Sequence, residues 1–254
     1  MERVRAKKQL GQHFLKDESI ARRIAESLSN LSHQLLEIGP GMGVLTKYLI
    51  DNKNYDFRVI EIDSESVDYL HTYYPTLNII EGDFLRMDLP QTFDNKLSII
   101  GNFPYNISSQ ILFKVYDHRD MVVEVVGMFQ KEVAERVAAH PGSKTYGILS
   151  VLLSAYYDIE YLFTVDEHVF NPPPKVKSAV IRLQRNGVQH LDCDEQLLLR
   201  VVKTGFNQRR KTLRNALKAL GMSLDHVPEN LLSQRAEQLS VEQFIEITNT
   251  LSAV

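Results

Sequence analysis

The strongest constraint on the fold is a strand, a glycine-rich turn and a helix that follow one another near residue 40. Residues 35–38 (LLEI) form a short apolar run, residues 39–43 (GPGMG) follow it, and apolar residues recur at helical spacing over 44–50. This order is typical of the first unit of a doubly wound parallel sheet, which binds ligands at the carboxyl ends of its strands. The glycines let the backbone approach a ligand closely, but their spacing is not G-x-G-x-x-G, which weakens a dinucleotide interpretation.

Two further predicted strands end in acidic residues. Residues 57–63 (FRVIEID) place Glu61 roughly 20 residues after the glycines, where a carboxylate can hold both hydroxyls of a ribose. Residues 77–83 (LNIIEGD) end in Asp83, which can accept a hydrogen bond from an adenine amine. Either acid taken alone is more often a helix cap or a solvated side chain. Three successive strand ends with ligand-type residues favour a nucleoside site at this edge of the sheet.

Residues 98–109 (SIIGNFPYNISS) carry the chemistry expected for work on the exocyclic amine of a base. The side-chain oxygen of Asn102 is an acceptor, Pro104 offers a carbonyl with no competing N–H, and Tyr105 supplies a ring on which a base can stack. An arylamine is a poor nucleophile because its lone pair is delocalised into the ring. Two acceptors on its two N–H bonds would favour a pyramidal nitrogen with a freer lone pair. The alternative is a strand-to-helix turn with a proline and a packed tyrosine.

Together these segments resemble the S-adenosylmethionine-dependent methyltransferases, and most closely the small-subunit branch of the ribosomal RNA adenine dimethyltransferases. The resemblance covers nearly the whole chain, through residues 12–17 (QHFLKD), 37–41 (EIGPG), 60–63 (IEID), 82–83 (GD), 102–108 (NFPYNIS), 172–180 (PPPKVKSAV) and 206–211 (FNQRRK). The chain departs from the family where Phe103 replaces a more frequent leucine and Lys177 replaces a common acid. We expect Phe103 to alter the shape of the target pocket and Lys177 to change only surface charge.

The resemblance implies both an activity and a site. The activity would be S-adenosylmethionine-dependent dimethylation of the exocyclic N6 amine of adenines, two adjacent ones, in small-subunit ribosomal RNA, with no metal. The implied catalytic residues are Asn102, Pro104 and Tyr105, and the implied cofactor-binding residues are His13, Leu15, Gly39, Glu61, Asp83 and Asn102. His13 and Leu15 would close over the methionine end of the cofactor, and Tyr105 would stack on a flipped target base.

Basic residues are concentrated in one segment, although the formal net charge of the chain is −3. Residues 196–224 contain no acid, and a helix over this segment would place Arg210, Arg214 and Lys218 on one face. We predict that this face binds RNA phosphates, through Arg209, Arg210, Lys211, Arg214 and Lys218. A second basic cluster lies at residues 3–8. The alternatives are a solvated helix face and, for Arg209, a structural ion pair.

The pattern along the chain predicts a Rossmann-like α/β fold, a doubly wound sheet of the class I methyltransferase type, with a small all-helical C-terminal domain. The expected elements are a helix over 17–30, alternating strands and helices over 35–116, strands over 121–128, 161–165 and 178–183, and helices over 131–139 and 145–157. The last two strands can pair antiparallel. From Glu195 the pattern is helical, with Ser240 as an N-cap. We therefore assign a cofactor-binding catalytic domain to 1–187 and a helical RNA-binding, substrate-docking domain to 188–254.

Composition sets broad limits. A chain of 254 residues can bury one large core and a small appendage. Cys193 is the single cysteine, which excludes an internal disulfide and a cysteine-based zinc site. No apolar run is long enough to span a membrane, and the basic start lacks the apolar core of a signal peptide. We expect a cytoplasmic monomer, and the resemblance implies that its partner is small-subunit ribosomal RNA in an immature small ribosomal subunit.

Three other functions remain open at the level of sequence. The first is methylation of adenine in large-subunit ribosomal RNA or another nucleic acid, against which residues 206–211 and the helical C-terminal segment argue. The second is a mainly non-enzymatic role in ribosome assembly, against which the intact residues 102–105 argue. The third is a nicotinamide dehydrogenase, which the glycine spacing disfavours. Incubation with labelled S-adenosylmethionine and immature small subunits, large subunits or bare RNA, followed by mapping of the labelled base, would settle most of this.

Overall fold

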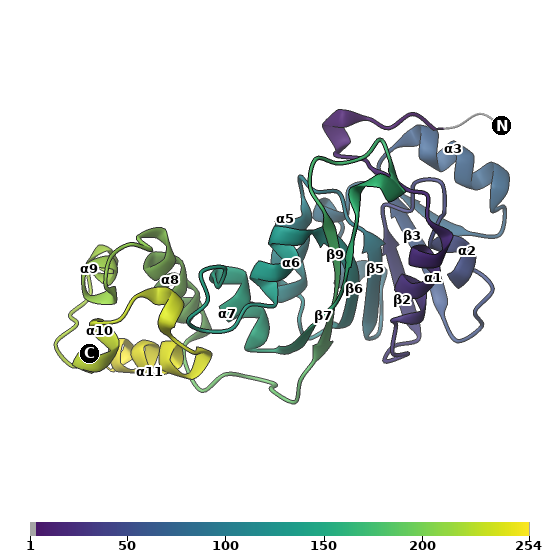
Figure 1. Cartoon of the computed structure of the whole chain (residues 1–254). Coiled ribbons are helices and arrows are strands. Elements are labelled where there is room, and N and C mark those ends of the chain that lie inside the picture. The colour runs from purple at the N-terminus through teal and green to yellow at the C-terminus, as the bar shows by residue number, and fades with distance from the viewer. Residues whose placement is uncertain (1–3, 254) are drawn as a thin grey trace. The chain divides into compact units, whose positions relative to one another are not determined.

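The computed structural model describes residues 4–253, and the contacts within it divide the chain into two compact units (Figure 1). An α/β unit comprises the described residues up to Ala134 together with Glu160–Arg185. A helical unit comprises Glu135–Ile159 and the described residues from Asn186 onward. The chain leaves the α/β unit for the last time after Arg185, close to the expected domain boundary at 187.

The helical unit takes in residues 135–159, which the sequence pattern assigned to the first domain. The cause is apolar packing. Tyr146 and Val151 lie in one buried cluster with Leu198, Leu213 and other side chains from the C-terminal helices. A single boundary along the chain therefore does not describe the division, because an internal segment joins the core of the second unit.

The α/β unit is built on a seven-stranded sheet with the order β4-β3-β2-β5-β6-β9-β7. The strands are β2 (Gln34–Ile38), β3 (Asp56–Glu61), β4 (Asn78–Glu81), β5 (Leu97–Asn102), β6 (Val122–Gln130), β7 (Tyr157–Val165) and β9 (Ser178–Arg185). Strands β4, β3, β2, β5 and β6 pair in parallel, and β9 is antiparallel to β6. The direction of winding reverses between β2 and β5, which is the topological switch point where such sheets bind ligands.

Helices and short elements complete this unit. They are α1 (Glu18–Glu26), α2 (Thr46–Leu49), α3 (Ser64–Tyr73), α4 (Leu89–Thr92), α5 (Ser108–Asp117), and the 3-10 turns η1 (Lys8–Leu10), η2 (Phe84–Arg86) and η3 (Glu167–Val169). Helix α6 (Lys131–Val137) begins in this unit and ends in the helical one. Strand β1 (Phe14–Leu15) pairs antiparallel with β8 (Phe170–Asn171) in a separate two-stranded sheet. Asp17 caps α1 by accepting from the N–H groups of Ser19 and Ile20. The doubly wound fold expected from the sequence is confirmed.

The middle of the sheet is apolar, and buried polar residues lie toward both ends of its strands. Leu35, Ile99 and Val125 on three adjacent strands have no solvent exposure. Glu37 and Glu61, in contrast, are buried acids at the carboxyl ends of β2 and β3. A buried carboxyl must find donors or change its protonation, so these strand ends are where ligand chemistry is expected.

The helical unit contains α7 (Ile148–Ser154), α8 (Glu195–Asn207), α9 (Leu213–Leu217), η4 (Lys218–Leu220), α10 (Glu229–Leu232), η5 (Ala236–Gln238) and α11 (Val241–Ser252). Leu198, Leu213, Phe244 and Ile247 are almost fully buried in its core. Ser240 caps α11 as predicted: its hydroxyl accepts from the N–H of Gln243, whose side chain accepts from the N–H of Ser240.

The prediction of one continuous basic helix face is wrong. Helix α8 ends at Asn207, a turn follows in which the Lys211 N–H donates to the Gln208 carbonyl, and α9 begins only at Leu213. The N–H of Leu213 donates to the Gln234 carbonyl at 2.7 Å instead of to the residue four positions earlier. The hydrogen bond between Leu213 and Gln234 thus interrupts the helix that the local spacing predicts.

No helix within residues 4–253 is both long enough and apolar enough to cross a membrane.

Candidate active site

One pocket opens at the carboxyl ends of the central strands. It gathers all three predicted catalytic residues and five of the six predicted cofactor-binding residues, namely His13, Gly39, Glu61, Asp83, Asn102, Pro104 and Tyr105. Residues 10–14 of the N-terminal segment form another part of its lining. Leu15 does not line this pocket; it is buried beside a small neighbouring cavity together with Gly39 and Asn102. The strand ends that the sequence singled out therefore meet in space.

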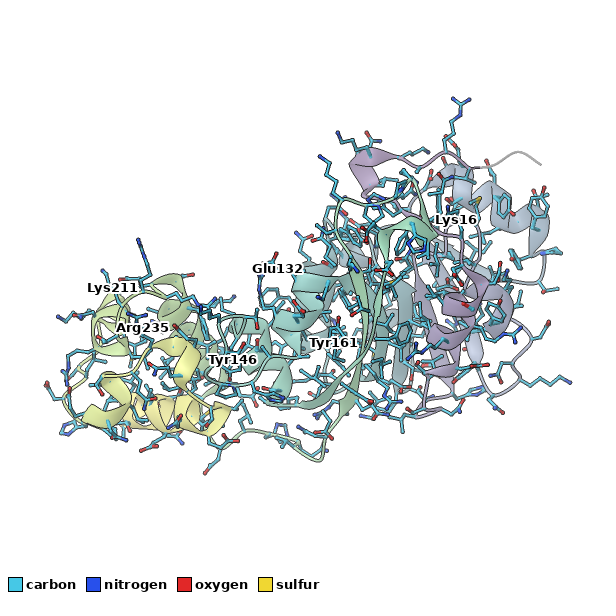
Figure 2. All side chains as sticks on the ribbon, viewed as in Figure 1. Lys16, Glu132, Tyr146, Tyr161, Lys211 and Arg235 are labelled. Carbon is cyan, nitrogen blue, oxygen red and sulfur yellow. The ribbon has the colours of Figure 1, made fainter. Side chains whose placement is uncertain are left out.

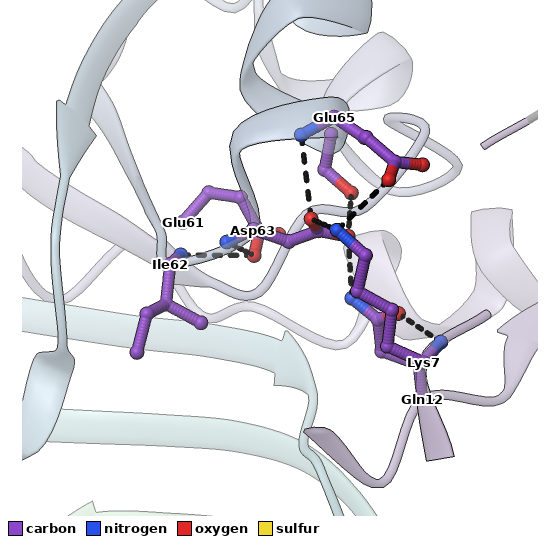
Figure 3. Close-up of polar contacts among 7 residues, drawn as sticks. Lys7, Gln12, Glu61, Ile62, Asp63 and Glu65 are labelled. Carbon is purple, nitrogen blue, oxygen red and sulfur yellow. Dashed lines mark hydrogen bonds and ion pairs between the residues drawn. The ribbon is translucent and has the colours of Figure 1, made fainter. Parts of the chain in front are cut away.

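Glu61 is oriented by the backbone around it. One oxygen accepts from the N–H groups of Ile62 and Asp63, each at 2.9 Å (Figure 3). The other accepts from the N–H of Gly41 at 3.1 Å. Burial raises the pKa of the Glu61 carboxyl, and the three backbone donors partly offset that rise. A carboxylate has about four acceptor positions, so Glu61 can still accept from the hydroxyls of a ribose.

Asp83 serves as a helix cap while it lines the pocket. One oxygen accepts from the Leu85 N–H at 2.9 Å and caps η2, and the other lies 3.7 Å from Arg86 Nε. The cap that the sequence left open as an alternative is thus present. Its partly exposed carboxylate keeps free acceptor positions at the pocket wall, which suits an amine donor.

Asn102 has its amide held in one orientation. Its Nδ2 donates to the His13 carbonyl at 2.9 Å. Its Oδ1 has no hydrogen-bond donor in the part of the chain that the structure describes, and Asn102 lines the pocket. The Pro104 carbonyl accepts from the Ile107 N–H at 3.2 Å and retains a second lone pair. The site therefore holds two acceptors with spare capacity, as the sequence predicted for gripping an amine.

Tyr105 is fixed from two directions. Its hydroxyl lies 2.5 Å from Ser178 Oγ on β9, and its ring centroid lies 5.2 Å from the His13 ring at a tilt of 31°. His13 Nδ1 in turn lies 2.8 Å from the Pro172 carbonyl. Burial raises the pKa of the Tyr105 phenol, so the hydroxyl stays protonated at neutral pH. A half-buried ring held at its edge and its hydroxyl presents a defined face for stacking.

Glu37 is the most strongly perturbed acid of the site region. Burial raises its pKa to about 8, although a hydrogen bond from Thr46 Oγ1 at 2.7 Å favours the charged form. The nearby charge of Glu61 adds to the rise. Glu37 lies beside the small cavity that adjoins Gly39, so its carboxyl is largely neutral at pH 7 in this arrangement.

Several lining residues had no site role assigned from the sequence. Leu10, Gly11, Phe84 and Leu85 were not singled out at all, and Ile38, Ile62, Asn106 and Ile107 were only part of the quoted motifs. Ile62 is the most informative, because it is 57% exposed and is one of the few large apolar side chains at the surface. An apolar side chain next to the ribose-type acid suits the flat face of a purine. Its position directly after Glu61 was the available signal.

The two departures from the family pattern have different settings. Phe103 is 1% exposed, lines the pocket wall and packs against Phe129 with ring centroids 4.9 Å apart. It therefore contributes to the shape of the pocket, as expected. Lys177 is half exposed and pairs with Asp166 at 2.6 Å, so its charge is used in a surface ion pair. Among residues 4–253, no group of three or more His, Cys, Asp or Glu side chains could hold a metal ion.

The predicted RNA contacts fall into two sets. The guanidinium of Arg209 donates to the Lys144 carbonyl and lies 3.9 Å from Glu237, and Arg214 pairs with Glu229. These two cations are used within the helical unit. Arg210, Lys211 and Lys218 are exposed and have no partner in the described part of the chain. Figure 2 shows Lys211 on the outside of the helical unit.

Comparison with known proteins agrees with this site. A family model described as ribosomal RNA adenine dimethylase matches residues 3–253. A ribosomal RNA small subunit methyltransferase A of Cytophaga hutchinsonii is 59% identical over 256 residues, covering 99% of both chains. The protein of that name from Flavobacterium johnsoniae is 59% identical over 258 residues, covering 100% of this chain and 98% of the relative.

Two solved structures match the whole fold. A dimethyladenosine transferase from Plasmodium falciparum superposes with a TM-score of 0.79 at 27% identity, covering 95% of this chain and 98% of that one. The 23S rRNA methyltransferase ErmE superposes with a TM-score of 0.70 at 25% identity, covering 94% and 99%.

Fold and site together define an S-adenosylmethionine-dependent methyltransferase of class I. The residues present fit that cofactor, since a backbone-oriented acid, an apolar side chain and a second acid follow one another around the pocket. The family match then narrows the class. The chain belongs to the ribosomal RNA adenine dimethylase family, whose model covers it almost from end to end.

Proposed function

We propose that the protein dimethylates the N6 amine of adenines, two adjacent ones, in small-subunit ribosomal RNA during ribosome assembly. The observation that carries the chemistry is Asn102. Its Nδ2 is occupied by the His13 carbonyl, so its Oδ1 acceptor remains for an incoming amine at the pocket wall. The small-subunit substrate is supported by the relatives named ribosomal RNA small subunit methyltransferase A, at 59% identity.

The α/β unit would bind the cofactor through its strand ends. Glu61 accepts from the ribose hydroxyls, Asp83 accepts from the adenine amine, and the backbone at Gly39 contacts the cofactor closely. When bound, S-adenosylmethionine supplies a methyl group that its sulfonium has already activated, so no strong base is required. The residues of the chain have to bind the cofactor, orient it toward the target amine and exclude water.

The target amine would be held by two acceptors. Asn102 Oδ1 and the Pro104 carbonyl accept its N–H bonds and favour a pyramidal nitrogen, while the Tyr105 ring stacks on the base. Such positioning can supply roughly 7–11 kcal/mol of the barrier reduction. The target adenine must leave its stack or lie in an open loop to reach the pocket. Dimethylation further requires that the pocket accept the monomethyl product.

The helical unit would dock the RNA. Arg210, Lys211 and Lys218 are exposed cations, and phosphates bind such residues because counterions are released. A flipped base offers few contacts of its own. We therefore expect the folded particle of an immature small subunit, recognised by shape, to be a better substrate than short RNA.

The test is methyl transfer to defined particles. The protein is incubated with labelled S-adenosylmethionine and either immature small subunits, large subunits or bare RNA, and the labelled base is mapped. We expect N6-dimethyladenine in immature small subunits. Label in large subunits instead would contradict the proposal and favour the activity named for the ErmE structure, which shares the whole fold. Binding to small subunits without label would favour a non-enzymatic assembly role.

A further inference from the structure

We propose that Lys7 and Gln12 are positioning residues that fasten the N-terminal strap, residues 7–14, over the cofactor pocket by binding Asp63. The inference rests on the proposed cofactor site at Glu61. It adds a function for Lys7, which does not line the pocket, and for Gln12, which does, and it links the N-terminal segment to the strand end proposed to bind the ribose.

The fastening consists of a compact polar cluster (Figure 3). Lys7 Nζ forms an ion pair with Asp63 Oδ1 and lies 3.1 Å from Glu65 Oε1. Gln12 Nε2 donates to Asp63 Oδ2 at 3.1 Å, and Gln12 Oε1 accepts from the Lys7 N–H at 2.8 Å. The Asp63 side chain has no solvent exposure. Two side chains of the strap, five residues apart, thus bind one buried carboxylate.

The strap has little else to hold its start in place. None of the residues of η1 (Lys8–Leu10) is buried, so burial of apolar surface contributes little there. One other contact to η1 is weak: Asn106 Nδ2 donates to the Gln9 carbonyl at 3.4 Å. Leu10, Gly11, His13 and their neighbours nevertheless line the pocket. The charged cluster is therefore the main polar tether of the start of this segment, whereas residues 13–15 are held by Asn102, Pro172 and strand β8.

The tether lies next to Glu61, the residue proposed to bind the ribose of the cofactor. Asp63 follows Glu61 by one intervening residue, and the Asp63 N–H donates to Glu61 Oε1 at 2.9 Å. Asp63 also caps α3, since it accepts from the Glu65 N–H and from Ser66 Oγ. One carboxylate thereby connects the strap, the helix start and the ribose acid. A strap that opens leaves the cofactor less enclosed and loosens the support of Glu61.

Electrostatics favour the fastened state. Burial alone would raise the pKa of Asp63, but the hydrogen bonds from Lys7 and Gln12 outweigh burial and hold its pKa below the usual value. Asp63 is consequently an anion at neutral pH. Releasing Lys7 would leave a buried carboxylate without its cation, and that state is costly. The closed strap is therefore the populated one, and cofactor affinity scales with that population.

The neighbouring lysine provides a matched control. Lys8 has the same charge and lies in the same strap, but it is exposed, with no partner in the described part of the chain. If the basic start of the chain acted only through RNA phosphates, Lys7 and Lys8 would be equivalent. The proposal requires that substitutions of Lys7 and Lys8 affect cofactor affinity differently in the absence of RNA.

The experiment compares Lys7→Met, Lys7→Arg and Lys8→Met with the wild type. Calorimetry without RNA measures affinity for S-adenosylmethionine, and hydrogen exchange measures protection of amides 9–14 in the ligand-free protein. We expect Lys7→Met to weaken affinity roughly tenfold, the size of one hydrogen bond to a charged group, and to speed exchange in the strap. Lys7→Arg should retain most of the affinity, and Lys8→Met should match the wild type in both measurements.

A second variant tests the partner. Asp63→Asn keeps an acceptor for the cap of α3 but removes the charge that Lys7 meets. Lys7→Met should have little further effect in the Asp63→Asn background, because the two changes remove the same interaction. Equal affinities and equal exchange for Lys7→Met and Lys8→Met would overturn the proposal. A wild type that binds the cofactor but methylates no ribosomal RNA would instead contradict the proposed function, while the difference between the two lysines would still support the strap.

Discussion

The two units hold their functional side chains in opposite ways. In the α/β unit, Glu61 and Asn102 stand at strand ends, are buried or half-buried, and have their orientation set by backbone groups. In the helical unit, Arg210, Lys211 and Lys218 are exposed on a turn and a 3-10 segment with no fixed partner in the described residues. The difference follows from the chemistry. A reacting amine needs groups fixed to within a fraction of an ångström, whereas phosphate binding needs positive charge within reach.

The sharpest test of this contrast is Asn102→Ala. We expect single-turnover methyl transfer to fall about 10²–10³-fold, the size typical of a preorganised polar contact that counts most in the transition state. Affinity for RNA should stay near that of the wild type, since the phosphate contacts lie in the other unit. A single-turnover rate close to the wild type, at saturating RNA and cofactor, would remove Asn102 from the chemistry.

Glu61→Ala should be the next largest effect. The loss of a charged acceptor for two ribose hydroxyls corresponds to roughly 2–4 kcal/mol of cofactor binding free energy. Calorimetry with S-adenosylmethionine measures it, and Glu61→Gln, which keeps one acceptor oxygen, should lose less. Because three backbone N–H groups also lose their acceptor, the melting temperature of each variant is recorded alongside. Unchanged affinity in a folded Glu61→Ala protein would place the ribose elsewhere.

Charge reversal in the helical unit should have a smaller and graded effect. Changing Arg210, Lys211 and Lys218 to glutamate should weaken binding to the ribosomal particle and leave cofactor affinity intact. The slope of log affinity against log salt should become shallower by about 0.7–0.9 for each lost phosphate contact. Lys53→Glu, at an exposed lysine in a turn of the α/β unit, is the matched control. Equal salt slopes in the triple variant and the wild type would show that these cations are only solvated.

The smallest effect should come from Tyr105→Phe. This change keeps the ring for stacking but removes the hydroxyl that meets Ser178, so we expect methyl transfer to fall only about 2–10-fold, as for one neutral hydrogen bond. Tyr105→Ala should cost much more. Ser178→Ala should match Tyr105→Phe, and the double variant should add nothing, because both remove one contact. Equal losses for Tyr105→Phe and Tyr105→Ala would mean that stacking is not the role of the ring.

The contrast also explains what could be predicted from the sequence. The strand ends at Glu61, Asp83 and Asn102 were found because a parallel sheet brings the carboxyl ends of its strands to one edge, whatever the details of packing. The sequence also identified Glu37 as part of the turn motif. Its pKa of about 8 could not be foreseen, because that value depends on burial by residues from other strands and on the distance to Glu61.

Features that depend on long-range contacts were predicted less well. The basic residues after Asn207 follow helical spacing, but the bond between Leu213 and Gln234 ends that pattern. The sequence pattern assigned residues 135–159 to the first domain, yet Tyr146 packs with the C-terminal helices. The contact of Lys7 with Asp63 joins positions more than fifty residues apart, and no local periodicity encodes it.

The ring of Phe103 has a consequence for how this sequence can change over evolutionary time. Gly101 and Gly127 are paired across β5 and β6, and a Cβ added at either would lie 2.7 or 2.2 Å from that ring. Both distances are shorter than any tolerated contact, and at Gly101 the added Cβ would also meet the Ile38 carbonyl at 2.7 Å. At Gly127 the added Cβ would also lie 2.7 Å from the Phe129 ring, so position 127 can gain a side chain only after both rings have moved or been replaced. Substitutions at these positions therefore depend on one another, and packing against Phe103, Phe129 and the Ile38 carbonyl keeps both glycines under selection even though neither lines the pocket.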